Sequence, residues 1–332
     1  RSRRRRGCPR TPRMKVRFWG TRGSIPVALT ATQIRSKLLA TLRAASQRQL
    51  DSDEQIERFV DQELSFDVHG TYGGHSSCVE LLAGTAEHVL FDLGSGVRPF
   101  GQSVLQRVGA GVPQTYHVFM SHLHWDHIMG FPFFGPVYIP GNRIVIHGCH
   151  DALEAAFRRQ QAPPSFPVDF SSLAAQIEFV RLQPGQTHRI GGLLVTPKLQ
   201  RHEGDSYGYR VEAHEKCFVY STDSEHRVDD AEERQSFVEF FRGADLVVFD
   251  AMYALADAIS VKADWGHSSN IMGVELCQAA RARRLCMFHH EPAYDDERIE
   301  GVLRETRRFE EITRDDRPLE ILSAYDGLVI DL

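Results

Sequence analysis

The stretch that decides the fold is YHVFMSHLHWDH, residues 116–127. Its first five residues, YHVFM, are mainly apolar and β-favouring, and they predict a buried strand. Four candidate metal ligands follow this strand within six residues: His122, His124, Asp126 and His127. Packing gives no reason for so many ionisable groups at one strand end. The alternative is a polar loop in which histidines fall together by chance.

The spacing of these four residues suits two metal ions. In an extended strand end successive side chains alternate, so His122 and His124 point to the same side. Asp126 and His127 lie in the following turn and can face a second ion. Because neutral imidazoles and carboxylates are ligands that zinc prefers, the sequence predicts a zinc-dependent protein.

The motif HLHWDH resembles the HxHxDH signature of the metallo-β-lactamase superfamily and matches it at all four liganding positions. The resemblance implies an α/β fold, a four-layer αββα sandwich with the metals at strand ends between two sheets. It also implies further ligands in a fixed order: a histidine after one strand, a bridging aspartate after another, and a last histidine.

His202 resembles the first of these downstream histidines. It follows the strand-like run 193–199 and precedes SYGYR at 206–210. Two histidines compete for the position: His188, expected in a polar turn, and His214, at the far end of a strand. Asp223, after the run 217–220, resembles the bridging aspartate, since one carboxylate can reach two ions. The alternative for Asp223 is a helix cap in the acidic stretch that follows.

His289, after the run 285–288, resembles the last ligand, and a shift of one residue would put His290 there instead. The resemblance implies two ions per chain, Zn²⁺ or alternatively Mn²⁺ or iron, with a hydroxide nucleophile between them. The implied ligands are, for the first ion, His122, His124, His202 and Asp223, and, for the second, Asp126, His127, Asp223 and His289. Asp92, in FDLGSG at 91–96, is expected to hydrogen-bond a ligand from behind or to order the ligand loop.

The segment WGHSS at 265–269 resembles the GHS[ST] motif of the tRNase Z-like phosphodiesterase branch. The resemblance implies that His267 acts near the scissile phosphate, assisted by an acidic residue after the preceding strand. Asp250 stands at that acidic position, where the processing nucleases typically carry glutamate. We therefore expect Asp126, His267 and Asp250 to be the catalytic residues. The alternative is that His267 and Ser268 only cap the helix predicted over 268–283.

Two further segments, FWGTRGSIP at 18–26 and YGGHSSC at 72–78, resemble the branch's first hairpin and its small-residue turn. His75 stands where asparagine is expected, and is either a substrate contact or a polar turn residue. FPFFGP at 131–136 follows the metal-binding motif, and Phe133 is a candidate for stacking on a base. The alternative is that these phenylalanines fill the core.

The interval 147–189 has only a few basic residues, whereas the tRNA 3′-processing enzymes of this branch carry a long glycine-rich and basic arm there. The six cysteines also lack the cluster that marks an extra structural zinc in the phosphonate-pathway cyclic phosphodiesterases. The resemblance thus favours a phosphodiesterase for a small substrate such as a cyclic nucleotide. The alternatives are a tRNA-processing nuclease, a thioesterase or lactonase of the same fold, and a non-catalytic metal-dependent sensor or binding module.

Strand-like and helical runs alternate along the chain and predict one α/β domain over 14–332. Within 30–64, apolar residues recur at helical spacing amid charges, with Asp51 and Asp53 as break and cap. We interpret this segment as an inserted helical pair, which is either a solvated cover over the core or a lid or dimer surface. The runs 319–322 and 327–332 flank a Tyr325-Asp326-Gly327 turn signal, which predicts antiparallel pairing at the end of the chain.

The composition is that of an ordinary globular protein, with 42% hydrophobic and 25% charged residues among 332. A net charge of −5 argues against a nucleic-acid footprint over the whole body, while a local basic groove stays open. No apolar run approaches the roughly 18 residues needed to cross a bilayer. We expect a soluble, cytoplasmic protein with no membrane partner and with residues 1–13 as a basic extension. A homodimer is also open.

Overall fold

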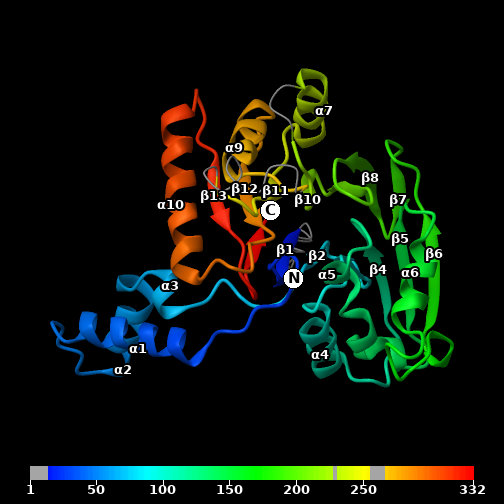
Figure 1. Cartoon of the computed structure of the whole chain (residues 1–332), viewed down its shortest axis with the longest axis horizontal. Helices are drawn as coiled ribbons and strands as arrows, with labels where there is room; N and C mark the ends of the chain where they lie inside the picture. The colour runs from blue at the N-terminus through cyan, green and yellow to red at the C-terminus, as the bar shows by residue number, and fades with distance from the viewer. Residues whose placement is uncertain (1–13, 227–229, 255–265) are drawn as a thin grey trace, which may run out of the picture.

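Two seven-stranded sheets stacked face to face form the centre of the molecule (Figure 1). The computed structural model describes residues 14–226, 230–254 and 266–332. The strands of the first sheet are, in spatial order, β14 (Val329–Asp331), β1 (Lys15–Gly20), β2 (Cys78–Leu82), β3 (His88–Phe91), β4 (Thr115–Phe119), β5 (Arg143–Gly148) and β6 (Gln176–Arg181). The strands of the second sheet are β13 (Glu320–Ser323), β12 (Arg284–Phe288), β11 (Leu246–Asp250), β10 (Lys216–Ser221), β9 (Ser206–Ala213), β8 (Leu193–Gln200) and β7 (His188–Ile190).

Helices pack on the outer face of each sheet. The first sheet is covered by α4 (Val97–Val108), α5 (Trp125–Ile128), α6 (Leu153–Gln160) and the 3₁₀ turns η2 (Phe131–Phe133), η3 (Gly135–Tyr138) and η4 (Phe170–Ser172). The second sheet is covered by α7 (Ala231–Phe241), α9 (Asn270–Ala279) and α10 (Asp296–Thr313).

The alternation of side chains along the strands separates three apolar clusters. In β4, Phe119 points between the sheets and meets Tyr209 of the second sheet, with ring centroids 5.5 Å apart. Val118, its neighbour, points outward into the cluster beneath α4 and α6. Strands of the second sheet likewise bury their outer faces under α7, α9 and α10. The predicted four-layer αββα sandwich is therefore confirmed.

Both sheets contain a block of parallel strands, β3 to β6 in the first and β10 to β13 in the second. The carboxyl ends of parallel strands lie at one edge of a sheet, where the following loops collect polar side chains. The motif that follows β4 and the loops that follow β10, β11 and β12 meet at this edge, and they form the site described below.

The prediction for the end of the chain is wrong in part. The turn at Tyr325 to Gly327 forms, with the amide of Leu328 bonded to the carbonyl of Tyr325 at 3.0 Å. However, β13 pairs with β12 in parallel in the second sheet, whereas β14 pairs with β1 antiparallel in the first. The Asp326 carboxylate accepts hydrogen bonds from the amides of Gly74 and His75, which fixes the turn as a crossing between sheets.

The inserted helical pair is present and projects from the sandwich as an arm (Figure 1). We call residues 31–63 the arm: α1 (Ala31–Ala45), α2 (Asp53–Arg58) and the π-helical turn η1 (Phe59–Glu63). The short helix α3 (Phe66–His69) packs against both α1 and α10. Ser52, between the two predicted residues, caps α2, because its hydroxyl accepts the amide hydrogen of Gln55. Thr30 caps α1 in a capping box with Gln33.

The basic extension 1–13 and Trp265 lie outside the described residues. His188 starts strand β7 and does not lie in a turn, so that detail of the prediction is wrong. Within the described residues, no helix is both long and apolar enough to span a membrane.

Candidate metal centre

The most buried polar cluster joins Asp126, His127, Asp223 and His289. Nε2 of His127 lies 3.1 Å from Oδ2 of Asp126 and 3.3 Å from Oδ1 of Asp223. Nε2 of His289 lies 3.3 Å from both Oδ2 of Asp126 and Oδ2 of Asp223, and 3.4 Å from Nε2 of His127. Nitrogen and oxygen atoms of four side chains from three different loops thus converge on one point.

These separations match those of a tetrahedral metal site. Zinc binds imidazole nitrogen and carboxylate oxygen at about 2.0–2.1 Å, so two ligands on neighbouring corners of a tetrahedron lie about 3.3 Å apart. The distances between the donor atoms are 3.1–3.4 Å. Imidazole nitrogens and carboxylate oxygens at this spacing around one point fit the corners of a tetrahedron. The residues therefore fit a zinc ion.

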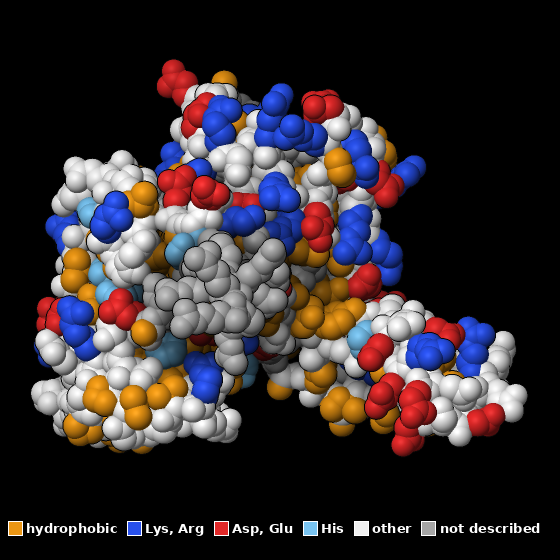
Figure 2. All heavy atoms as spheres, turned by 180° about the vertical axis from the view of Figure 1, so that it is seen from behind, with side chains coloured by type: hydrophobic (Ala, Val, Ile, Leu, Met, Phe, Trp, Pro, Cys, Tyr) orange, Lys and Arg blue, Asp and Glu red, His pale blue; other side chains and the backbone are white. Residues whose placement is uncertain are grey.

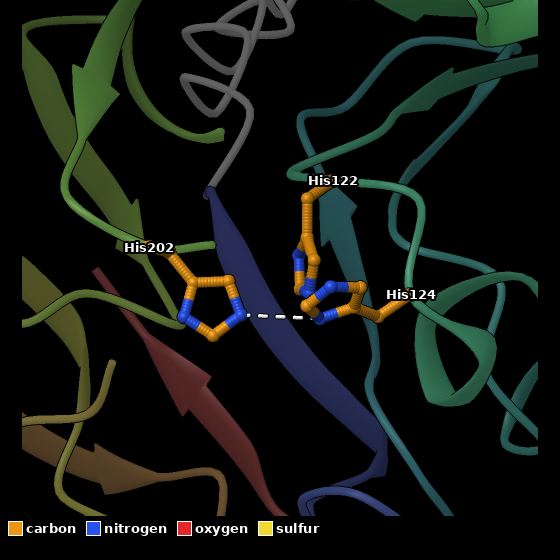
Figure 3. Close-up of side chains that lie close together, drawn as sticks. All are labelled: His122, His124 and His202. Carbon is orange, nitrogen blue, oxygen red and sulfur yellow. Dashed lines mark hydrogen bonds between the residues drawn. The ribbon is translucent and has the colours of Figure 1, made fainter. Parts of the chain in front are cut away.

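A second cluster contains His122, His124 and His202 (Figure 3). Nε2 of His202 lies 3.1 Å from Nδ1 of His124, and the ring of His122 points toward the pair. Nε2 of His122 is fully buried and has no hydrogen-bond partner. An orphaned buried nitrogen is costly unless something binds it, and a metal ion would do so.

Asp223 lies between the two clusters. Its Oδ1 is near His127, and its Oδ2 lies 3.6 Å from Nε2 of His122 and 3.9 Å from Nε2 of His202. The same Oδ2 lies 3.3 Å from His289. The alternative of a helix cap does not hold, because the side chain that caps α7 is Asp230. A single carboxylate thus faces both groups of imidazoles.

Hydrogen bonds on the side away from the clusters orient the imidazoles of His202 and His127. Nδ1 of His202 donates to the carbonyl of Gly266 at 2.8 Å, and Nδ1 of His127 donates to Oδ2 of Asp92 at 2.8 Å. Each Nε2 is then free to offer its lone pair to the cluster. Asp92 also accepts hydrogen bonds from the hydroxyls of Ser121 and Tyr220, so its placement behind a ligand agrees with the prediction.

Three residues of the site adopt the left-handed conformation that favours glycine. The φ angles of Asp92, Asp223 and His289 are 59°, 39° and 60°. Each follows the end of a strand, where a sharp turn aims the side chain into the space between the sheets. Non-glycine residues pay for this conformation, and such strain concentrates at functional sites. The strand ends are therefore shaped for the cluster as well as for the sheet.

The backbone of Gly23 passes close to the ring of His289, which explains the glycine at this position of the GTRGS segment, residues 20–24. A Cβ atom at this position would lie 2.5 Å from the ring of His289, so no other residue fits without moving that ring. The next amide, of Ser24, donates to Oδ2 of Asp126 at 2.8 Å. Sequence reasoning did not identify Ser24, although it lies in the quoted segment.

The electrostatics of the clusters show a shortage of positive charge. Burial lowers the pKa of His122 well below its usual value, and the neighbouring His127 lowers it further. Burial also lowers the pKa of His127, but Asp126 and Asp223 outweigh this and raise it well above its usual value. A buried pair of carboxylates thus needs a positive charge beside it, which a divalent cation can supply without protonating a ligand.

A histidine and a carboxylate form a separate pair beside the clusters. Nδ1 of His267 lies 2.8 Å from Oδ2 of Asp250, which is fully buried and held by the amides of Ser224 and Met252. Burial lowers the pKa of His267, but Asp250 more than offsets this, so the pKa is raised to about 9. The ring of His267 stacks at 5.0 Å on that of His289. The cap of α9 is Ser269, so His267 is not a helix cap.

The structure also decides between the competing histidines. Nε2 of His188 interacts with Gln183, and Nε2 of His214 bonds to the carbonyl of Ala83, both away from the clusters. His290 lies beside His289, but its Nε2 donates to the carbonyl of Ala324 at 2.8 Å. None of the three belongs to a group of described residues that could hold a metal.

The two predicted substrate contacts lie outside the clusters. His75 is half-buried, and its Nδ1 lies 3.1 Å from the hydroxyl of Ser95. Phe131 and Phe134 are buried, as the core alternative expected, whereas Phe133 is 57% exposed. Trp125, which the sequence did not single out, is 74% exposed between two ligand residues of the motif. The available signal was a large aromatic residue between two ligand residues of the motif.

The family is decided by comparison with known proteins. The model of the beta-lactamase superfamily domain matches residues 87–290, which include every candidate ligand. The chain belongs to the beta-lactamase superfamily. Its metallo-β-lactamase fold also matches the solved structure of YhfI from Bacillus subtilis, with a TM-score of 0.63, 17% identity, and coverage of 96% of this chain and 100% of that one.

Two ribonucleases are among the similar proteins. Ribonuclease Z of Thermoplasma acidophilum is 22% identical over 277 residues, 69% of this chain and 86% of its own. Ribonuclease BN of Escherichia coli O1:K1 is 24% identical over 272 residues, 66% of this chain and 83% of its own. The chain is thus a metallo-β-lactamase-fold hydrolase with ribonucleases among its relatives.

Proposed function

We propose that this hydrolase is a dinuclear metal-dependent phosphodiesterase acting on a small phosphodiester such as a cyclic nucleotide. The observation that carries the proposal is the pair of His267 and Asp250, 2.8 Å apart beside two metal-fitting clusters. Hydrolysis of a thioester expels a thiolate, a weaker base than an alkoxide, which leaves without a separate acid; a lactone expels an alkoxide and is distinguished by assay. A phosphodiester expels an alkoxide, whose departure a neighbouring imidazolium assists.

The two ions are assigned to the clusters that share Asp223. The first ion would be held by His122, His124, His202 and Asp223, and the second by Asp126, His127, Asp223 and His289. Zinc bound there supplies a hydroxide at neutral pH and positive charge for the phosphate oxygens.

Three side chains, those of Asp126, His267 and Asp250, would position the reacting groups and supply the proton. The carboxylate of Asp126 is fixed by the amide of Ser24 and holds its position beside the nucleophile. His267 keeps 9% of its side chain exposed, so substrate can reach the ring, while Asp250 fixes the ring's orientation from the buried side. The proton passes from His267 to the leaving oxygen.

The choice of a small substrate rests on charge and surface. The interval 147–189 has four arginines and four acidic residues, so it offers no net positive charge for an RNA backbone. Arg158 and Arg181 of this interval pair with Glu154 and Asp151. The exposed ring of Phe133 gives a base a surface for stacking. The ribonuclease relatives support phosphodiester chemistry, since RNA is itself a phosphodiester.

Turnover of a substrate panel tests the proposal. Zinc-loaded and manganese-loaded protein would be assayed with cyclic nucleotides, linear dinucleotides, bis(p-nitrophenyl) phosphate, a thioester and a lactone. We expect hydrolysis of cyclic nucleotides and the nitrophenyl diester, with loss of turnover in His122→Ala. His214→Ala is the matched control, because His214 lies away from the clusters.

Each other outcome has a defined meaning. Turnover of the thioester or lactone without the diesters would replace the proposal by a non-phosphate hydrolase. Cleavage of precursor tRNA with no activity on cyclic nucleotides would indicate a nuclease. Metal binding without turnover of any substrate would indicate a sensor.

A further inference from the structure

Helix α1 packs on the protein through its polar face. Lys37 donates from Nζ to the carbonyls of Asp67 and Gly70, and it forms an ion pair of 2.7 Å with Asp296 of α10. Gln33 and Ala40 line the same side, where a hollow of about 300 Å³ separates α1 from α10. An ordinary surface helix turns its apolar stripe inward. The orientation of α1 is the reverse.

The apolar stripe of α1 faces solvent. Ile34, Leu38 and Leu42 follow one another at a spacing of four residues and are 47%, 58% and 64% exposed. No residue of α1 is buried. On α2, Ile56 is 44% exposed. The three side chains of α1 together expose on the order of 300 Å² of apolar surface, at the lower end of the range for the largest patch on a typical monomer.

The arm carries opposite charges on its two segments. Residues 31–50 contain four basic residues and no acidic one, and residues 51–63 contain six acidic residues and one basic one. Figure 2 shows acidic side chains gathered on this projection. Arg35 and Arg43 form no ion pair among the described residues, nor do Glu57 and Asp61. The net charge of the arm is therefore −1, which is unsuited to a nucleic acid or an anionic membrane.

We infer that the arm is an interface through which two copies of this chain associate about a twofold axis. The apolar stripe of α1 in one copy packs against the arm of the other. The symmetry sets the basic segment of each copy against the acidic segment of the other, so one surface complements itself. A stable interface buries roughly 800 Å² per partner. The three apolar side chains of α1 supply more than a third, and the flanking side chains of the arm supply the rest.

The first test removes the apolar stripe. Sedimentation equilibrium of the full chain should show a dimer, and Leu38→Glu with Leu42→Glu should raise its dissociation constant at least about 100-fold. Ile312→Glu is the matched control, because Ile312 is 67% exposed on α10 away from the arm. It should leave the dimer unchanged. A monomeric wild type, or a dimer that survives the double substitution, would overturn the inference.

The second test exchanges the charges and excludes a fold defect. One variant carries Arg35→Glu and Arg43→Glu, and the other carries Glu57→Lys and Asp61→Lys. Each alone places like charges across the twofold axis and should be monomeric, while a mixture of the two should form a heterodimer. Failure of the mixture to associate, with both variants showing wild-type circular dichroism, would overturn the inference. So would a monomer whose arm binds tRNA.

Discussion

Replacing His267 by alanine separates proton donation from metal binding. The imidazole is held by one hydrogen bond of 2.8 Å to Asp250, and its ring lies next to those of His202 and His289. If it protonates the leaving oxygen, kcat on a cyclic nucleotide should fall by roughly 10²- to 10⁴-fold, the usual contribution of a general acid. Metal content should not change, because the seven assigned ligands remain.

The leaving group provides the internal comparison. Nitrophenolate is a weak base that departs without a proton, so the same variant should lose little activity on bis(p-nitrophenyl) phosphate. The assay compares kcat for both substrates, with elemental analysis of each preparation and His214→Ala as control. An equal loss on both substrates would refute proton donation. Loss of one ion would make His267 a ligand, which its position within 4.8 Å of ligand atoms of His202 and Asp223 allows.

Three further substitutions test the site. Asp223→Ala should reduce turnover more than His289→Ala, because it removes a ligand from both ions; comparable residual rates would contradict the shared position. Asp92→Ala should weaken zinc affinity by roughly 10- to 100-fold, measured by competition with a chelator, since it frees the ring of His127; unchanged affinity would count against that support. Phe133→Ala should raise KM for a cyclic nucleotide and not for methyl p-nitrophenyl phosphate, and an unchanged KM would exclude stacking.

The candidate ligands could be predicted because each lies directly after a strand. A strand end can be predicted from a local pattern, and the resemblance to the metallo-β-lactamase superfamily supplied the order of the ligands along the chain. The position of Asp250 was predicted in the same way, and its bond to His267 agrees with it. The sequence named Phe133 as a stacking candidate and core filling as the alternative, and it could not decide between them, because the side chains of 3₁₀ turns lack a simple periodicity.

The partners of distant segments could not be predicted. A turn signal at Tyr325 to Gly327 indicates that the chain reverses, but it does not determine which sheet each of the two flanking strands joins. That depends on Asp326 bonding to Gly74 and His75, some 250 residues earlier in the chain. The orientation of α1 is similar: its periodicity predicted a helix, while Lys37 and Asp296 determine which face points inward.

Stepwise zinc reconstitution of metal-free protein tests the central claim most directly. Hydrolysis of bis(p-nitrophenyl) phosphate would be followed as zinc is added, with bound metal measured at each point. The account predicts that activity reaches its plateau at two equivalents per chain. In His127→Ala, the content of tightly bound metal should fall to one. Full activity at one equivalent, or wild-type metal content in His127→Ala, would contradict a dinuclear phosphodiesterase.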